Sequence, residues 1–221
     1  MSPRRTAGLG ALLVAAAYLT GIGFVLGPLA PLGLGTGAMD GAAVLRLAEQ
    51  TPWLLPLWMS VIYDLSALGT ALMGLALARL LARDLPPLAL ASGAVALLWT
   101  GMTLASGMVA RAGLAELAAL APDDLPRALE TWRMLHLIET ALSGRTEALG
   151  GLWIGLASLA GVRIGALSGV ASLLGAGVAL AGVATYLPSL SQGGGMVFGL
   201  GAILWCGWAG LEWILPRPDE T

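Results

Sequence analysis

The stretch LPRALETWRMLHLIETALSGRTEALGGLWIGLASLAG, from Leu125 to Gly161, indicates where a site should lie in this chain. At 3.6 residues per turn, one face of the helix that it predicts is polar, and this face carries the only histidine. The polar face holds Trp132, His136, Glu139, Ser143 and Glu147. Apolar residues cover much of the rest of this helix, among them Leu135, Leu137, Ile138, Ala141 and Leu142. A polar face on an otherwise apolar helix is the natural place for a binding site.

The length of this stretch exceeds what a membrane can hold. Asp123 or Asp124 can cap its beginning, and Pro126 suits the first turn. A helix of about 37 residues extends about 55 Å, whereas bilayer hydrocarbon is about 30 Å thick. Either the first part lies outside the membrane, or the Ser143-Gly144 pair divides the stretch into two helices. We favour one continuous helix, with any kink at this pair.

The composition excludes an ordinary soluble domain. Hydrophobic residues make up 57% of the 221 residues, charged residues make up 11%, and 32 residues are glycine. This is the composition of a polytopic membrane protein, whose immediate partner is the lipid bilayer. The net charge is −2 and the chain has no basic run, so we exclude nucleic acid as a partner.

Cysteine and histidine are too scarce for several common sites. Cys206 is the only cysteine, so the chain has no internal disulfide and no thiolate metal cluster. His136 is the only histidine, which excludes a bis-histidine haem and a three-histidine zinc site within the chain. We predict no cofactor and no intrinsic metal, while a bound lipid or apolar small molecule fits the composition.

Apolar runs with flanking prolines and arginines predict an all-α fold, a bundle of six transmembrane helices with short outer amphipathic helices. The first run is too long for the core of a secretory signal. One outer helix is expected from Asp40 to Glu49. The predicted spans form a single domain, 1–221, and cover approximately 7–30, 52–83, 88–110, 125–161, 164–187 and 196–215.

Six spans place both chain termini on one side of the membrane. The arginines next to short turns and chain ends then share that side; they are Arg4, Arg5, Arg79, Arg83, Arg163 and Arg217. Positive residues near helix ends favour the cytoplasmic side. We therefore predict a multi-pass protein of the inner (plasma) membrane with cytoplasmic N and C termini.

Two charged residues fall inside predicted spans. Counted from the arginines at the cytoplasmic ends, the depths of Asp64 and Arg145 differ by about one helical turn. An unpaired carboxylate in hydrocarbon is costly, so we predict that these two residues form an ion pair, with Tyr63 or Glu147 nearby. The pair either fixes the second and fourth predicted helices or forms a ligand site open to the outside. We favour the structural role.

His136 and Glu139 have the i, i+3 spacing of two metal ligands on a bundle helix, and Asp64 could add a third. A histidine bonded to a local acid is the commoner arrangement for so short a motif. We therefore favour the hydrogen-bonded pair over a metal site.

Three tryptophans lie near the middle of predicted spans, namely Trp99, Trp153 and Trp205, whereas Trp53 and Trp58 belong near an interface. Each central indole N–H needs an acceptor. The three rings either line a pocket for a lipid tail, a quinone or another apolar ligand, or pack as core against glycine-rich neighbours. We favour the core, and keep all three as candidate ligand-binding residues.

Small residues recur at four-residue spacing, which lets helices approach closely. Ala11 and Ala15 on the first helix resemble the faces by which vitamin-uptake substrate subunits dock their partner. Such faces allow a membrane-protein partner or a homo-oligomer, although we favour packing within the chain. The glycine pairs are Gly23/Gly27, Gly151/Gly155, Gly165/Gly169 and Gly195/Gly199.

Two stretches resemble a bacterial family of six-helix integral membrane proteins known only as a domain of unknown function. In Asp40 to Arg83, an acid opens a short outer helix and IYDLSALGTALMGLALARLL follows. The second, Glu147 to Leu190, reads EALGGLWIGLASLAGVRIGALSGVASLLGAGVALAGVATYLPSL and is similar to that family's paired fourth and fifth helices. The resemblance implies a fold and a bacterial inner membrane, and implies no activity.

These features favour a protein that binds a small molecule or lipid, or an accessory membrane subunit, with a polar pocket between the second and fourth predicted helices. The first alternative is a transporter component, a substrate-binding membrane subunit. The second is a membrane-embedded enzyme that uses His136, Glu139 and Asp64. Because the chain has no recognised nucleophile or nucleotide motif, we rank the enzyme below the binding protein.

Overall fold

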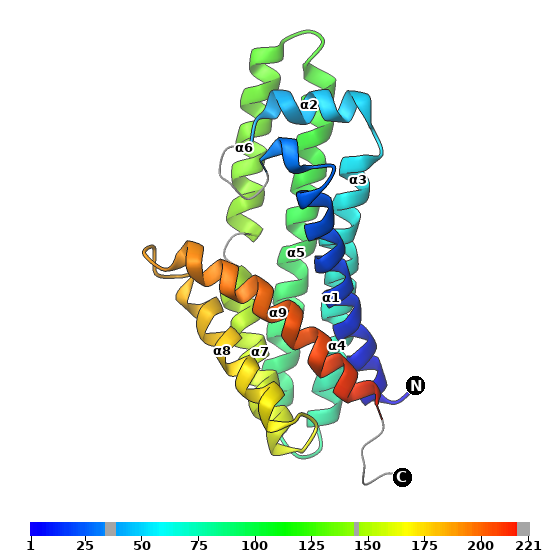
Figure 1. Ribbon diagram of the computed structural model, residues 1–221, viewed down its shortest axis with the longest axis vertical. Helices are drawn as coiled ribbons and strands as arrows, with labels where there is room; N and C mark the ends of the chain where they lie inside the picture. The colour runs from blue at the N-terminus through cyan, green and yellow to red at the C-terminus, as the bar shows by residue number, and fades with distance from the viewer. Residues whose placement is uncertain (34–38, 144–145, 216–221) are drawn as a thin grey trace.

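The computed structural model describes residues 1–33, 39–143 and 146–215, and every regular element in these ranges is helical. This confirms the predicted all-α class. The molecule is elongated, and α1, α4 and α5 run along its long axis (Figure 1). The elements are α1 (Pro3–Leu26), η1 (Ala30–Leu32), α2 (Gly41–Gln50), α3 (Leu54–Met59), η2 (Ser60–Leu65), α4 (Ser66–Leu81), α5 (Pro86–Leu120), α6 (Leu125–Ser143), α7 (Thr146–Arg163), α8 (Gly169–Ala184) and α9 (Ser191–Ile214).

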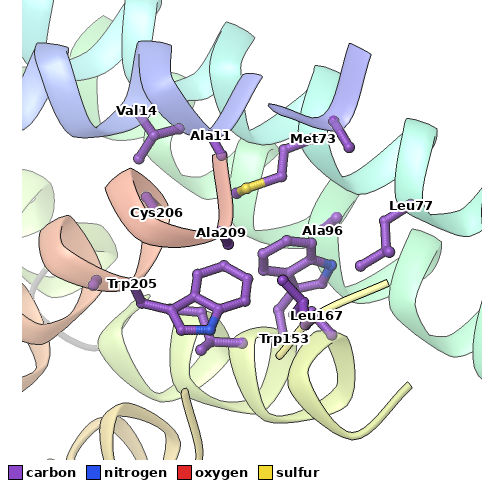
Figure 2. Close-up of a cluster of buried hydrophobic side chains, with 14 of the residues drawn as sticks. Ala11, Val14, Met73, Leu77, Ala96, Trp153, Leu167, Trp205, Cys206 and Ala209 are labelled. Carbon is purple, nitrogen blue, oxygen red and sulfur yellow. The ribbon is translucent and has the colours of Figure 1, made fainter. Parts of the chain in front are cut away.

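Buried side chains form two separate cores. The bundle core lies among α1, α4, the first half of α5, α7, α8 and α9, and includes Met73, Trp153 and Trp205 (Figure 2). The extension core lies where α5 and α6 continue beyond the bundle and α2 crosses them (Figure 1). It includes Leu117 and Trp132. We call these two parts of the molecule the bundle and the extension.

The segments α3, η2 and α4 form one continuous helix, Leu54–Leu81, in which η2 is a π-helical turn. A π-helical turn inside an α-helix changes the direction of the side chains around it and is frequent at functional sites. This turn carries Tyr63 and Asp64. The sequence pattern predicts the long helix but has no signal for the wider turn.

Helices of the bundle approach each other closely through glycine. A Cβ atom on Gly10 of α1 would lie 2.6 Å from the backbone nitrogen of Met73 and 2.7 Å from the carbonyl oxygen of Gly69. Any side chain at this position would push α1 and α4 apart. The two backbones are therefore in direct contact, which is the packing expected of membrane helices rich in small residues.

Four of the described helices are long and apolar enough to cross a membrane: α1, Leu54–Leu81, α5 and α9. The helix α8 is apolar but shorter. Many large apolar side chains of these helices are exposed, including Leu68, Leu97, Leu180 and Leu204. This surface is suited to lipid, as predicted for a membrane protein. The count of six spans stays a prediction.

Some helix boundaries differ from those predicted. We predicted that the third span ends at 110, beside Arg111, and that a separate helical segment follows from Leu114 to Leu120. Instead, α5 continues without a break to Leu120 and buries Leu117. We began the last span at 196 because glycines precede it, but α9 begins at Ser191. The absence of a side chain lets Gly194 lie close to the carbonyl oxygen of Ala181 on α8.

Other boundaries shift by a few residues. The first predicted span, 7–30, corresponds to α1 at Pro3–Leu26, and the fifth, 164–187, corresponds to α8 at Gly169–Ala184. A turn with Gly165 at a φ of 65° and the N-cap Ser168 separates α7 from α8. The predicted short helix after Asp40 is α2, and the Asp40 side chain accepts a hydrogen bond from the Ala42 nitrogen.

The predicted helix 125–161 corresponds to α6 and α7, which lie on either side of residues 144–145. These two residues, where we placed any kink, are outside the described ranges. The helix α6 packs along the end of α5 in the extension, whereas α7 packs against α8 and the first half of α5 in the bundle. The stretch from Leu125 to Gly161 therefore contributes α6 to the extension and α7 to the bundle.

Candidate functional site

The buried acid Glu139 on α6 is the centre of a hydrogen-bond network. Its Oε1 accepts hydrogen bonds from the hydroxyl of Tyr63 at 2.7 Å and from that of Ser143 at 3.0 Å. Its Oε2 lies 3.2 Å from Nδ1 of His136 and 3.4 Å from the hydroxyl of Thr140. Both carboxylate oxygens are therefore engaged by the protein, and the network connects η2 to α6.

The network keeps Glu139 charged. Burial by itself raises the pKa of this carboxyl group, because the charged form loses water. Hydrogen bonds from His136, Tyr63 and Ser143, together with the charge of His136, favour the charged form more strongly and lower the pKa below its ordinary value. At neutral pH Glu139 is a carboxylate.

Helical spacing accounts for the α6 half of the network. His136, Glu139 and Ser143 follow one another at intervals of three and four residues, so their side chains share one face. The ring of Trp132, one turn earlier, stacks on His136 with centroids 5.2 Å apart and planes at 8°. The structure thus has these four side chains on one face, as the sequence predicts.

Asp64 belongs to a different contact. Its Oδ2 lies 2.5 Å from Nη2 of Arg111, which also donates to the hydroxyl of Ser60 at 3.3 Å. Arg145, the predicted partner of Asp64, is outside the described residues. Tyr63, predicted beside that pair, instead donates to Glu139, because neighbouring residues on a helix point in different directions. The partner of Asp64 within the described residues is therefore Arg111, which we did not predict.

A cavity of about 520 Å³, the bundle cavity, lies between α1, η2, α5, α7 and α9. Its wall is mostly apolar and includes Trp99, Phe198 and Ile203. Met196 and Leu200 of α9 line the cavity and are exposed on the flank of the bundle. The cavity therefore reaches the surface of the molecule at these residues of α9.

Polar side chains gather where the bundle cavity meets the extension. Tyr63, Thr103, Ser143, Thr146 and Glu147 all line it. The shared acceptor Glu139 places the Tyr63 and Ser143 hydroxyls side by side, and the Thr146 hydroxyl donates to the Ser143 carbonyl at 2.7 Å. The cavity therefore has an apolar part and a polar end.

A second cavity of about 220 Å³, the extension cavity, lies on the other side of the network. Trp58, Trp132, His136 and Glu139 line it. Tyr63 and Ser143 line both this cavity and the bundle cavity. The hydrogen bonds of Tyr63 and Ser143 to Glu139 therefore form part of the partition between the two cavities.

The three central tryptophans have different positions. Trp99 lines the bundle cavity, whereas Trp153 and Trp205 are fully buried in the bundle core (Figure 2). Neighbouring rings of Trp99, Trp153, Trp205 and Trp213 lie 5.8 to 6.3 Å apart. Among the described residues, the indole N–H groups of Trp153, Trp205 and Trp213 have no hydrogen-bond acceptor. The acceptors that we expected for the first two are therefore not found there.

Within the described ranges, no group of three histidine, cysteine or acidic residues is placed to hold a metal ion. The predicted third ligand, Asp64, faces Arg111. Its position does not support the arrangement of His136, Glu139 and Asp64 on which the metal and enzyme alternatives depend.

Several small-residue faces are used inside the chain. Ala11 and Ala15 are buried in the bundle core, so they are not exposed to a partner. Cβ atoms on Gly151 and Gly155 of α7 would lie 2.9 to 3.0 Å from atoms of α8. Gly199 lines the bundle cavity. The docking interface expected of a transporter component therefore has no support from Ala11 and Ala15.

The helical fold, the apolar surface and the four helices long enough to cross a bilayer define a helical membrane protein. Comparisons of the chain with family models, with curated proteins and with solved structures found no match. The resemblance to the six-helix family stays a prediction.

Proposed function

We propose that the chain crosses a bacterial inner membrane six times, with α1, Leu54–Leu81, α5, α7, α8 and α9 as spans and the extension on the outer side. Two observations support this topology. Arg4 at the beginning of α1 donates to the carbonyl oxygen of Glu212 near the end of α9 at 2.7 Å, so these ends lie together. Arginines near the short turns at that end favour the cytoplasm.

We further propose that the protein binds an apolar small molecule or a lipid chain in the bundle cavity, which the second and fourth predicted spans line together with the first, third and last. The observation that carries this proposal is a cavity of about 520 Å³ with an apolar wall, a polar end and exposed residues of α9 in its lining. Ligand sites typically have volumes of about 300–1,000 Å³ and combine apolar walls with a few polar groups. A ligand dissolved in the membrane can enter sideways without crossing water.

Two glycines of α9 allow a matched test. A Cβ atom on Gly199 or on Gly207 would meet nothing within 4 Å, so neither helix position is crowded. Gly199 lines the bundle cavity, whereas Gly207 lies two turns further along α9, outside the residues lining that cavity. Gly199→Leu should fill part of the cavity, and Gly207→Leu should leave it open.

The measurement is native mass spectrometry of each variant released from lipid nanodiscs, with bound small molecules counted as mass additions. The wild type and Gly207→Leu should carry the same additions, and Gly199→Leu should lose them. Equal additions in all three proteins, or none in the wild type, would reject the bundle cavity as a ligand site. Thermal unfolding of each variant serves as the control for folding.

A further inference from the structure

Four hydroxyl groups that line the bundle cavity donate their protons to acceptors within the protein. Thr103 donates to the carbonyl oxygen of Trp99 at 2.9 Å, and Thr146 donates to that of Ser143 at 2.7 Å. Tyr63 and Ser143 both donate to Glu139. Each hydroxyl has one proton and two lone pairs, so these four oxygens retain only acceptor capacity.

We infer that the bundle cavity selects an apolar molecule whose polar end donates hydrogen bonds, that is, a hydroxyl or amino group. This inference rests on the proposed ligand-binding function and names the class of ligand. A polar group buried without a partner is costly, so recognition depends on matching donors to acceptors. A ketone, quinone or ether offers only acceptors and would face the lone pairs of these four hydroxyls.

The arrangement along α5 gives the ligand a direction. Tyr63 packs against Gly107, where a Cβ atom would lie 2.6 Å from that of Tyr63. Thr103 lies one turn before Gly107, and Trp99 lies one turn before Thr103, in contact with Phe198 at a centroid distance of 6.3 Å. The hydrogen-bond-donating end of the ligand therefore lies beside Tyr63 and Thr103, and the apolar part of the ligand lies against Trp99 and Phe198.

Two isomers provide a direct test. Dodecan-1-ol and 1-methoxyundecane have the same atoms and nearly the same length, but only the alcohol has a hydrogen-bond donor. Each is titrated separately into nanodiscs that hold the full-length protein, and the bound fraction is read by native mass spectrometry. Binding to Gly199→Leu is subtracted as the background from lipid partitioning. We expect the wild type to bind the alcohol about 5- to 10-fold more tightly than the ether, the effect of about one hydrogen bond.

A pair of variants assigns this preference to the cavity hydroxyls. The double substitution Thr103→Val and Thr146→Val keeps the shape of both side chains and removes their lone pairs. It should reduce the ratio between alcohol and ether to about 2-fold or less. Thr100→Val is the control, because Thr100 is buried on the same helix but does not line the cavity. This control should keep the ratio of the wild type.

Each result has a separate meaning. If the wild type binds the ether as tightly as the alcohol or more tightly, the inferred preference for a hydrogen-bond donor is wrong. The proposed ligand site would still stand. An unchanged ratio in the double variant would overturn Thr103 and Thr146 as the acceptors and would leave Tyr63 and Ser143 in that role. Failure of both isomers to bind above the Gly199→Leu background would instead overturn the proposed function.

Discussion

The bundle and the extension share α5 but are stabilised by different contacts. In the bundle, buried tryptophan rings contact one another edge to face, and a Cβ atom on Gly175 would lie 1.9 Å from Oγ of Ser158 and 2.5 Å from Nε1 of Trp205. In the extension, four donors surround the carboxylate of Glu139. The first interior depends on shape and the second on hydrogen bonding.

This difference follows from the surroundings of each part. Helices in lipid gain little from apolar burial, because the lipid is as apolar as the core, and they associate mainly through close packing. The helix α6 has an exposed side with Glu130 and Arg133 and a buried side with Glu139. Its buried charge is stable because its acceptors are satisfied. Substitutions should therefore have different effects in the two parts.

The largest effect is expected from Trp205→Ala in the bundle. Trp205 is fully buried and contacts Trp153 and Trp213, so the substitution leaves a cavity that neighbouring rings cannot fill. We expect a loss of about 3–5 kcal/mol in the free energy of unfolding, measured by denaturant titration in detergent. Trp53→Ala is the control, because Trp53 is 61% exposed. Equal losses for both variants would contradict the role of packing.

The next effect is expected from Tyr63→Phe, at the junction of the two parts. This change removes a hydrogen bond to a buried carboxylate and keeps the ring, so the free energy of unfolding should fall by about 1.5–3 kcal/mol. Tyr186→Phe alters an exposed tyrosine and should have almost no effect. If the two variants unfold at the same denaturant concentration, the hydrogen bond to Glu139 does not stabilise the protein.

Acid should weaken the extension through Glu139. Because the folded-state pKa of Glu139 lies below its unfolded value, its charge contributes full stability above about pH 4.5, and this contribution disappears as the pH falls through the folded-state pKa. The midpoint of thermal unfolding should therefore fall less steeply below pH 4.5 in Glu139→Gln than in the wild type. Glu130→Gln, an exposed acid of the same helix, should keep the slope of the wild type. If the unfolding midpoint of Glu139→Gln falls as steeply with pH as that of the wild type, Glu139 is not the cause of the loss of stability in acid.

The smallest effect is expected from the pair of Asp64 and Arg111. Their side chains are 45% and 35% exposed, so solvent should screen the attraction. A double-mutant cycle with Asp64→Asn and Arg111→Gln should give a coupling energy of about 0.5–1 kcal/mol. A coupling above about 2 kcal/mol would show that lipid encloses the pair. The same cycle with Arg145→Met tests the pairing predicted from depth and should be additive if Arg111 is the partner.

The polar face of α6 was predictable because its helix is amphipathic. His136, Glu139 and Ser143 recur at helical spacing among apolar residues, and this pattern marks one face before any fold is known. Tyr63 was predicted close to a polar pocket, but its partner is Glu139 and not the ion pair of Asp64. The π-helical turn that carries Tyr63 and Asp64 has no signal in the sequence, so the relative directions of these two side chains could not be predicted.

The sequence by itself determined the all-α membrane class, the existence of the long helices and the polar face of α6, because hydropathy and periodicity are local properties of the chain. The tertiary structure alone decided that Arg111 pairs with Asp64, that Trp99 lines the bundle cavity and that Trp153 and Trp205 lie in the bundle core. The helices of the bundle are apolar on every side, so no face is marked as inward. Their rotations and crossings follow from glycine contacts between distant segments, which no local pattern contains.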